Sequence, residues 1–243
     1  MVSDALISAI LHRSARGKHP VVSLSFMIYS IVTGFSFSIG VAAIIGGLRY
    51  NRINPAYYPF LYCCWIGLMN ECISFIESYE GHSNAINSNI YVLLEFILFI
   101  WQFYRWGFFG RHRYWWPVPL IIIGGVWIWE NFFPYRLDRF SSYFRVLYSF
   151  ALVLMSISIL NRQIVREKQH LLKNPIALIC LGTIIYYTYK VLVEAFWLYG
   201  LNQGSNFRNN VYLILAFINL FTNLIFALAV LWMPKKLRFT LPY

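Results

Sequence analysis

Residues 211–234, VYLILAFINLFTNLIFALAVLWMP, contain no charged side chain. A membrane-spanning helix needs about 20 predominantly apolar residues, because the ~30 Å hydrocarbon core is crossed at ~1.5 Å per residue. This stretch meets that requirement, and so does the stretch from Pro20 to Leu48, which is also free of charge. Both ends of the chain therefore predict helices that cross a bilayer.

The composition of the whole chain agrees with this prediction. Of the 243 residues, 59% are hydrophobic and only 12% are charged, whereas soluble domains carry about 25% charge. So little charge does not cover the surface of a water-soluble globule, which disfavours a soluble enzyme, a disordered chain and a secreted disulfide scaffold. The four cysteines fall within apolar stretches, where thiols pack as small apolar groups. They are Cys63, Cys64, Cys72 and Cys180.

The rest of the chain divides into further apolar segments joined by short polar loops, so we expect an all-α polytopic membrane protein with seven transmembrane helices. The fourth segment has the shortest clean apolar stretch, because it contains Glu130, Pro117 and Pro119. The predicted spans are Val21–Leu48, Pro55–Tyr79, Ile86–Phe109, Tyr114–Phe133, Tyr143–Arg162, Asn174–Gly200 and Asn209–Met233.

The Lys and Arg residues are distributed unequally between the two sides of this predicted bundle. Loops and termini on the side of the N-terminus carry seven of them and the other side carries twelve, with Lys190 inside a span. Cytoplasmic loops collect Lys and Arg. We therefore expect the N-terminus outside and the C-terminus inside, in a bacterial inner membrane. The net charge of +11 is then a topology signal and does not indicate nucleic acid binding.

Three short patterns recur about 120 residues apart, which suggests a three-helix unit used twice. The pairs are Asn54-Pro55 with Asn174-Pro175, Gly81 with Gly200, and residues 89–96 with residues 210–217. The alternative is chance recurrence in spans that are rich in aromatic residues and Asn. A fourth span between two such units would return the second copy to the orientation of the first, which gives a parallel repeat.

The corresponding division of the chain has five parts. It comprises an amphipathic segment (1–20), repeat A (21–109), a connector helix (114–133), repeat B (143–233) and a basic cytoplasmic tail (234–243). This three-plus-one-plus-three layout resembles that of SWEET-type sugar exporters and of nicotinamide riboside transporters. The likeness lies in the layout alone, since the paired Pro-Gln signature of the first group is absent.

Several ionisable and amide side chains fall inside the predicted spans. A charged residue there costs about 2.5–3.5 kcal/mol on insertion scales, so each is a candidate for function. Glu71 and Lys190 lie ten residues before Gly81 and Gly200, which places opposite charges at matching positions near the bilayer midplane. They either pin helices together or bind a solute between the repeats. The candidate binding residues are Glu71, Glu95, Lys190, Glu194, Asn219, Asn223 and Gln102.

No pattern in the chain indicates an enzyme. The five histidines lie in loops or terminal segments, no GxSxG motif occurs, and Asp is found only at positions 4 and 138. We therefore expect no catalytic residue, no metal site and no cofactor.

Two function classes remain, with membrane lipids as partners in both. A carrier for a small polar solute needs a bundle, a duplicated unit and a polar site at the midplane. A receptor or accessory subunit would instead reach a protein partner through its basic cytoplasmic loops. The carrier is slightly favoured, because nothing in the chain resembles an output module.

Overall fold

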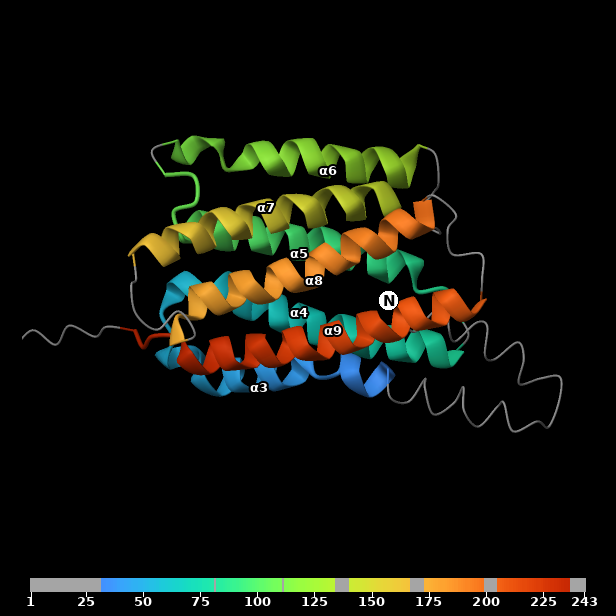
Figure 1. The fold of residues 1–243 in the computed structure, drawn as a ribbon, viewed down its shortest axis with the longest axis horizontal. Helices are drawn as coiled ribbons and strands as arrows, with labels where there is room; N and C mark the ends of the chain where they lie inside the picture. The colour runs from blue at the N-terminus through green and yellow to red at the C-terminus, as the bar shows by residue number, and fades with distance from the viewer. Residues whose placement is uncertain are drawn as a thin grey trace, which may run out of the picture.

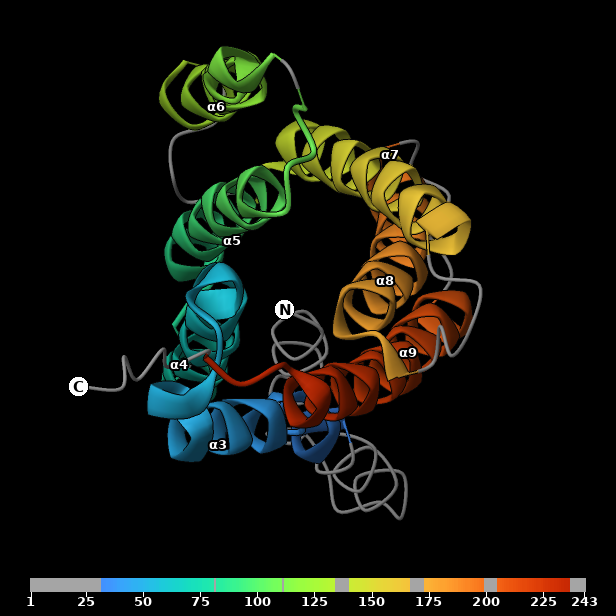
Figure 2. The ribbon, with the colours of Figure 1, turned by 90° about the vertical axis from the view of Figure 1, so that its left-hand side faces the viewer.

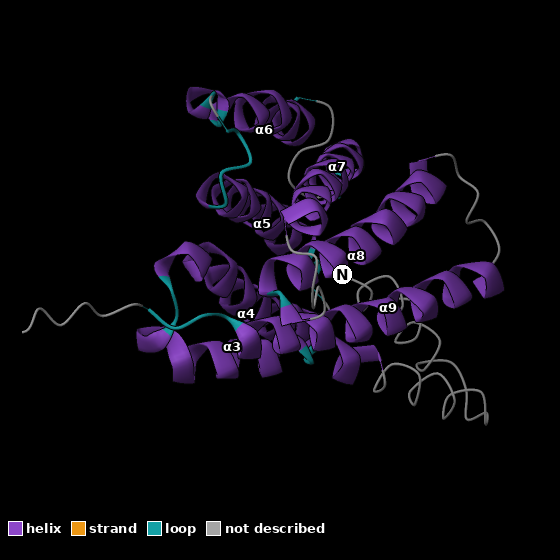
Figure 3. Cartoon of the chain, turned by 60° about the vertical axis from the view of Figure 1, so that its left-hand side comes forward, coloured by secondary structure: helices purple, strands orange, loops and turns teal. Residues whose placement is uncertain are grey.

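The computed structural model is helical throughout its described part (Figure 3). It describes residues 32–80, 82–110, 112–133, 140–166, 173–198 and 205–236. The α-helices in these ranges are α3 (Ile39–Arg49), α4 (Tyr58–Glu80), α5 (Ala85–Arg105), α6 (Pro117–Phe132), α7 (Ser142–Arg166), α8 (Pro175–Leu198) and α9 (Ser205–Trp232). Short 3₁₀ turns lie at Tyr50–Arg52, Pro55–Tyr57 and Arg113–Trp115.

Six helical segments of the described part are long and apolar enough to cross a membrane, so the chain is an all-α integral membrane protein. They comprise the segment Val32–Arg52, which contains α3, the segment Pro55–Glu80, which contains α4, and α5, α7, α8 and α9. The fourth predicted span corresponds to α6, which has only 16 residues. At 1.5 Å per residue such a helix is about 24 Å long, so a seventh span stays a prediction.

The six longer segments form a ring, and α6 lies outside it (Figure 2). Around the ring each helix packs on the next in the order α3, α4, α5, α7, α8, α9 and back to α3, while α6 covers α5 and α7. Along the bundle, α3, α5, α7 and α9 run in one direction and α4, α6 and α8 run in the other (Figure 1). The ring thus surrounds one common interior, to which distant parts of the chain contribute.

Both copies of one recurring pattern, Asn-Pro, start helices in the same way. The side chain of Asn54 accepts a hydrogen bond from the backbone N–H of Ala56 at 2.9 Å, ahead of Pro55. The side chain of Asn174 accepts one from Ile176 at 2.9 Å, ahead of the proline that opens α8. An Asn cap satisfies a free N–H of the first turn, and proline at the first helical position has none to satisfy.

The ends of α3, α5, α7 and α9 lie together at one end of the bundle (Figure 1), which we call the basic end. There Arg49 donates to the carbonyl of Val230 at 2.6 Å and to that of Met233 at 3.3 Å, at the end of α9. Arg162 donates to the carbonyls of Gly107 and Phe108 at 3.1 and 3.0 Å, just after α5. Each arginine thus satisfies backbone carbonyls at or just beyond a helix C-terminus, whose last carbonyls lack intrahelical partners.

Two glycines end α5 earlier than Phe109, the residue that was predicted from the apolar pattern. Gly107 and Gly110 have φ angles of 72° and 50°, which other residues adopt only with strain. The chain turns there towards the 3₁₀ turn that precedes α6. An apolar pattern continues through such a turn, so it does not reveal where the helix stops.

Aromatic rings fill the interior of the ring near the basic end. Phe60 of α4 contacts Phe99 of α5 and Phe226 of α9, with ring centroids 6.4 and 5.1 Å apart. Phe226 lies directly against Gly182 of α8, where a Cβ atom would come within 2.6 Å of the ring. A side chain at position 182 would therefore force this aromatic cluster apart.

Some predictions fall on parts of the chain that the structure does not describe. The amphipathic segment 1–20, the first part of the first span up to residue 31, and most of the tail, residues 237–243, lie outside the described residues. The division into two repeats stays a prediction as well.

Candidate functional site

A polar cavity lies inside the ring. It encloses about 70 Å³, enough for a few water molecules or a group of similar size. Its walls come from α4, α5, α8 and α9, with Ile39 at the start of α3 and Ser36 just before it. Five of the seven candidate residues from the sequence line it, and these are Glu71, Glu95, Lys190, Asn219 and Asn223.

The centre of the site is an ion pair between α5 and α8. The Nζ atom of Lys190 lies 3.6 Å from Oε2 of Glu95, and both side chains are buried. Tyr91 donates to one carboxylate oxygen of Glu95 at 2.6 Å, and Tyr148 of α7 donates to the other at 2.9 Å. Lys190 also donates to the hydroxyl of Tyr148. Of the buried carboxylates that the sequence places inside the spans, Glu95 is thus the one that pairs with Lys190.

Aromatic rings surround the ammonium of Lys190. Its Nζ atom lies 5.0, 5.4 and 5.2 Å from the ring centroids of Tyr148, Tyr186 and Tyr187. At such distances the negative face of a ring attracts a cation, and more strongly when both are removed from water. We call these three tyrosines with Glu95 the ammonium cage.

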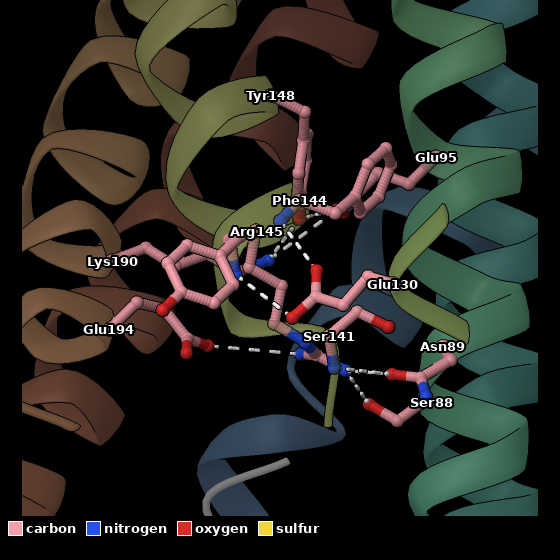
Figure 4. A network of polar contacts seen from close by, with 11 residues as sticks. Ser88, Asn89, Glu95, Glu130, Ser141, Phe144, Arg145, Tyr148, Lys190 and Glu194 are labelled. Atoms are coloured by element: carbon pink, nitrogen blue, oxygen red, sulfur yellow. Dashed lines mark hydrogen bonds and ion pairs between the residues drawn. The ribbon is translucent and has the colours of Figure 1, made fainter. Parts of the chain in front are cut away.

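A second buried cation lies towards the opposite end of the bundle from the basic end. Arg145 of α7 has no exposed surface and its guanidinium bridges two helices (Figure 4). It donates to Ser88 and Asn89 of α5 at 3.0 and 3.1 Å, and it lies 3.9 Å from Glu194 of α8. Glu194 therefore belongs to this bridge and does not line the cavity.

The start of α7 is held by a carboxylate from α6. Glu130 accepts from the backbone N–H groups of Tyr143 and Phe144 at 3.1 and 2.9 Å. These are among the first N–H groups of α7, which lack intrahelical partners and carry a partial positive charge. Glu130, which shortens the clean apolar stretch of the fourth predicted span, therefore has a structural role at the start of α7.

Gln102 of α5 has a different environment from the other candidates. Its side chain accepts from the N–H of Phe60 at 2.9 Å and donates to the carbonyl of Ala56 at 2.7 Å. The first bond satisfies a backbone N–H at the start of α4, and the second satisfies a carbonyl of the 3₁₀ turn that precedes α4. Asn223 of α9 instead donates to the hydroxyl of Ser38 at 2.8 Å and borders the cavity.

Sequence reasoning missed several residues of the site. Arg145 was counted as a loop charge because it lies only two residues after the predicted start of its span. Tyr91 and Tyr148 were not distinguished from the other 16 tyrosines, because their spacing along the helix looks like that of any packing residue. Thr222 of α9 was also missed, although it follows Asn219 by three residues and so lies on the same helix face.

The hydroxyl of Thr222 is unusual among the polar groups that line the cavity. Thr222 is only 1% exposed, and its Oγ1 atom has no hydrogen-bond partner among the described residues. Leaving a buried polar group unpaired typically costs about 1–3 kcal/mol. Thr222 is also one of the residues that line the cavity.

The described part of the chain contains no group of three or more His, Cys, Asp or Glu residues that could hold a metal ion. The cavity wall offers carboxylates, an ammonium, amides and hydroxyls, together with the thiols of Cys63 and Cys64. Comparisons of the chain with protein-family models, with curated proteins and with solved structures find no match.

Proposed function

We propose that this chain is a membrane carrier that binds a small polar solute in the cavity inside the helix ring. The observation that carries the proposal is the content of the cavity wall, which combines Glu71, Glu95 and Lys190 with the unpartnered hydroxyl of Thr222. Buried charges add little to stability, because their desolvation largely cancels their attraction. Their presence around a hollow is better explained by a solute.

The arrangement of the helices supports two moving units, α3–α5 and α7–α9. Corresponding helices of the two units, such as α3 and α7, run in the same direction. A half-turn that exchanges the two units leaves the order of the helices around the ring unchanged. The arginines of the basic end repeat this relation. Arg49, at the end of the first helix of one unit, holds the end of α9, and Arg162, in the first helix of the other, holds the segment after α5.

Contacts between the units lie on both sides of the cavity, as alternating access requires, in addition to the Lys190–Glu95 pair in the cavity wall. At one end Arg145 joins α7 to α5 through Ser88 and Asn89. At the basic end Arg49 and Arg162 join the units through backbone carbonyls. A carrier that exposes the cavity to each side in turn would release these two sets of contacts alternately.

Orientation and the seventh span complete the proposal. We infer that the basic end faces the cytoplasm of a bacterium and that the N-terminus lies outside. Because Arg145 is buried inside the bundle, only six Lys and Arg residues remain in loops on the outer side against twelve on the cytoplasmic side, which strengthens the bias.

A seventh span at α6 is supported by the course of this helix along α5 and α7 (Figure 1). The Trp- and Tyr-rich stretch 114–116 would then lie at the interface between membrane and water.

One observation favours the second candidate, a receptor or accessory subunit. Arg52, Lys235 and Lys236 line a cleft with Asn51 at the basic end, and an acidic protein partner would fit this cleft. Purification of the chain together with one such partner in a fixed ratio would favour this function over the carrier.

The carrier function is tested by uptake into vesicles that contain the purified protein, with a panel of small cations, zwitterions, anions and neutral polyols. We expect uptake of at least one solute, and its loss in Glu71→Gln and in Lys190→Met when compared per folded protein. Glu80→Gln is the matched control on α4, because Glu80 is exposed and lies beside His82 at the helix end. Uptake that is unchanged in both cavity variants would contradict the proposed site.

A further inference from the structure

A cleft at the basic end gathers three cations, which we call the cleft cations. They are Arg52, Lys235 and Lys236, and they line the cleft together with Asn51. The cleft has a volume of about 470 Å³, and all four residues are exposed. In the part of the chain that the structure describes, the side chains of the cleft cations make no hydrogen bond and no ion pair.

Backbone pairing brings the cleft cations together. The N–H of Asn54 donates to the carbonyl of Pro234 at 3.0 Å, and the N–H of Lys236 donates to the carbonyl of Arg52 at 2.7 Å. These bonds join the turn after α3 to the segment after α9, which lies far from it in the sequence. The backbone of the cleft is thus ordered in advance, so a ligand has only the side chains to order.

The cleft cations are not used to satisfy the end of α9. Arg49, the last residue of α3, already donates to the carbonyls of Val230 and Met233 at 2.6 and 3.3 Å. The cleft therefore adds three positive charges beyond those that the helix ends require. Like charges that share one site repel each other, and a bound anion relieves this repulsion.

Apolar and aromatic side chains place the cleft at the boundary of the membrane. Leu48 and Trp232 lie just before its two segments and are 82% and 37% exposed, as expected of side chains that face lipid tails. Next to them the ring of Tyr50 stacks on that of Tyr58 with centroids 4.6 Å apart, and its hydroxyl lies 2.8 Å from that of Tyr62. Tyr and Trp collect at the level of the lipid headgroups, so the cleft lies at the same level.

This position favours a lipid over an acidic protein as the anionic partner. Lipid phosphates are already present at the level of the cleft, whereas a protein would have to enter the headgroup layer. Lys and Arg near a membrane surface attract anionic lipids, and basic pockets between spanning helices bind phosphate-bearing headgroups.

We propose that the cleft cations bind the phosphate of an anionic phospholipid, whose acyl chains lie along the exposed apolar side chains at the ends of α3 and α9. Lipid binding here does not depend on transport, because it requires only that the chain is an integral membrane protein. The lipid holds the turn after α3 and the segment after α9 through their side chains, in addition to the backbone pairing.

The test measures which lipids the purified full-length protein retains. The protein is equilibrated in micelles with an equimolar mixture of dioleoylphosphatidylglycerol and dioleoylphosphatidylcholine and then repurified, and its lipids are quantified by mass spectrometry. We expect a ratio of phosphatidylglycerol to phosphatidylcholine well above that of empty micelles. Lys235→Gln combined with Lys236→Gln should lower this ratio about five-fold or more, and high salt should lower it too.

Two further variants control for charge and for folding. Arg105→Gln combined with Lys173→Gln removes the same charge from exposed residues at the basic end that do not line the cleft, so the ratio should stay at the level of the unaltered protein. Lys235→Arg combined with Lys236→Arg keeps both charges and should keep the ratio. All of these side chains are exposed, and the thermal unfolding midpoint in lipid-free micelles checks that each variant folds.

The other outcomes contradict the proposal in distinguishable ways. Equal retention of the two lipids, or equal loss in the cleft variant and its charge-matched control, would show that the cleft does not select anionic lipid. Displacement of phosphatidylglycerol by inorganic phosphate at constant ionic strength would show that the cleft takes the free anion instead. Binding of polyglutamate that is lost in the cleft variant, without any lipid preference, would assign the cleft to an acidic protein and favour the receptor or accessory subunit.

Discussion

Cations at the basic end and cations inside the ring are held in different ways. Arg49 and Arg162 donate to backbone carbonyls at helix ends, at a site where the guanidinium of Arg162 is exposed. Lys190 and Arg145 are buried and lie beside the carboxylates of Glu95 and Glu194. Arg49 and Arg162 are thus held without an acidic partner, whereas Lys190 and Arg145 each lie beside a carboxylate.

This difference separates structural charge from charge that indicates a site. A helix C-terminus carries a partial negative charge, so an arginine there stabilises the fold and keeps part of its hydration. A buried ion pair must be desolvated on both sides, and well-packed apolar residues of similar size are often as stable. Stability alone therefore explains the interior pairs poorly, which supports the binding site proposed around Lys190 and Glu95, whereas the arginines of the basic end are explained by helix ends alone.

The largest effect is expected from breaking the central pair. Lys190→Met leaves the carboxylate of Glu95 buried without its cation, and we expect a loss of about 3–5 kcal/mol in the free energy of unfolding. Adding Glu95→Gln removes the orphaned charge while an amide oxygen still accepts from a tyrosine, so the double variant should recover at least about half of that loss. Reversible unfolding in mixed detergent micelles measures both. A double variant no more stable than Lys190→Met would show that the pair does not act as a unit.

A smaller effect is expected from a matched pair of arginine variants. Arg145→Gln removes two buried hydrogen bonds and the partner of Glu194, so we expect a loss of about 2–4 kcal/mol. Arg162→Gln acts on exposed contacts to helix-end carbonyls, and its loss should stay at or below about 1 kcal/mol. The same unfolding measurement compares the two. Equal losses would remove the distinction between the two regions.

The sequence predicts the local features of the fold better than the packing of its helices. Apolar length is a local property, so six spans are found from it, with most boundaries within a few residues of the helices. The end of α5 is missed because the turn at Gly107 and Gly110 interrupts no apolar pattern. The ring order depends on which helix faces pack together, and the length and pattern of the apolar segments do not reveal that.

For the site, the sequence reveals most of the charged residues in the cavity wall but not how they are paired. Glu71, Glu95 and Lys190 are recognised because charge is rare inside a span, and all three line the cavity. The pairing of Lys190 with Glu95 joins α8 to α5, so no short spacing encodes it. Arg145 is missed because a span boundary inferred from hydropathy does not tell a buried first turn from a loop.

The smallest effect on stability is expected from the exposed charges of the basic end. Arg52, Lys235 and Lys236 are exposed, and their side chains line an open cleft. Replacing all three by Gln should change the free energy of unfolding by less than about 0.5 kcal/mol, because surface charges contribute little.

The same triple replacement removes three of the twelve cations on the proposed cytoplasmic side, so it should increase the fraction of molecules inserted in the opposite orientation. Labelling of a cysteine placed in the C-terminal tail, with a reagent that does not cross the membrane, measures that fraction. A triple variant that is strongly destabilised but keeps its orientation would show that the basic end is structural in the same sense as the interior, and the comparison of the two regions would not hold.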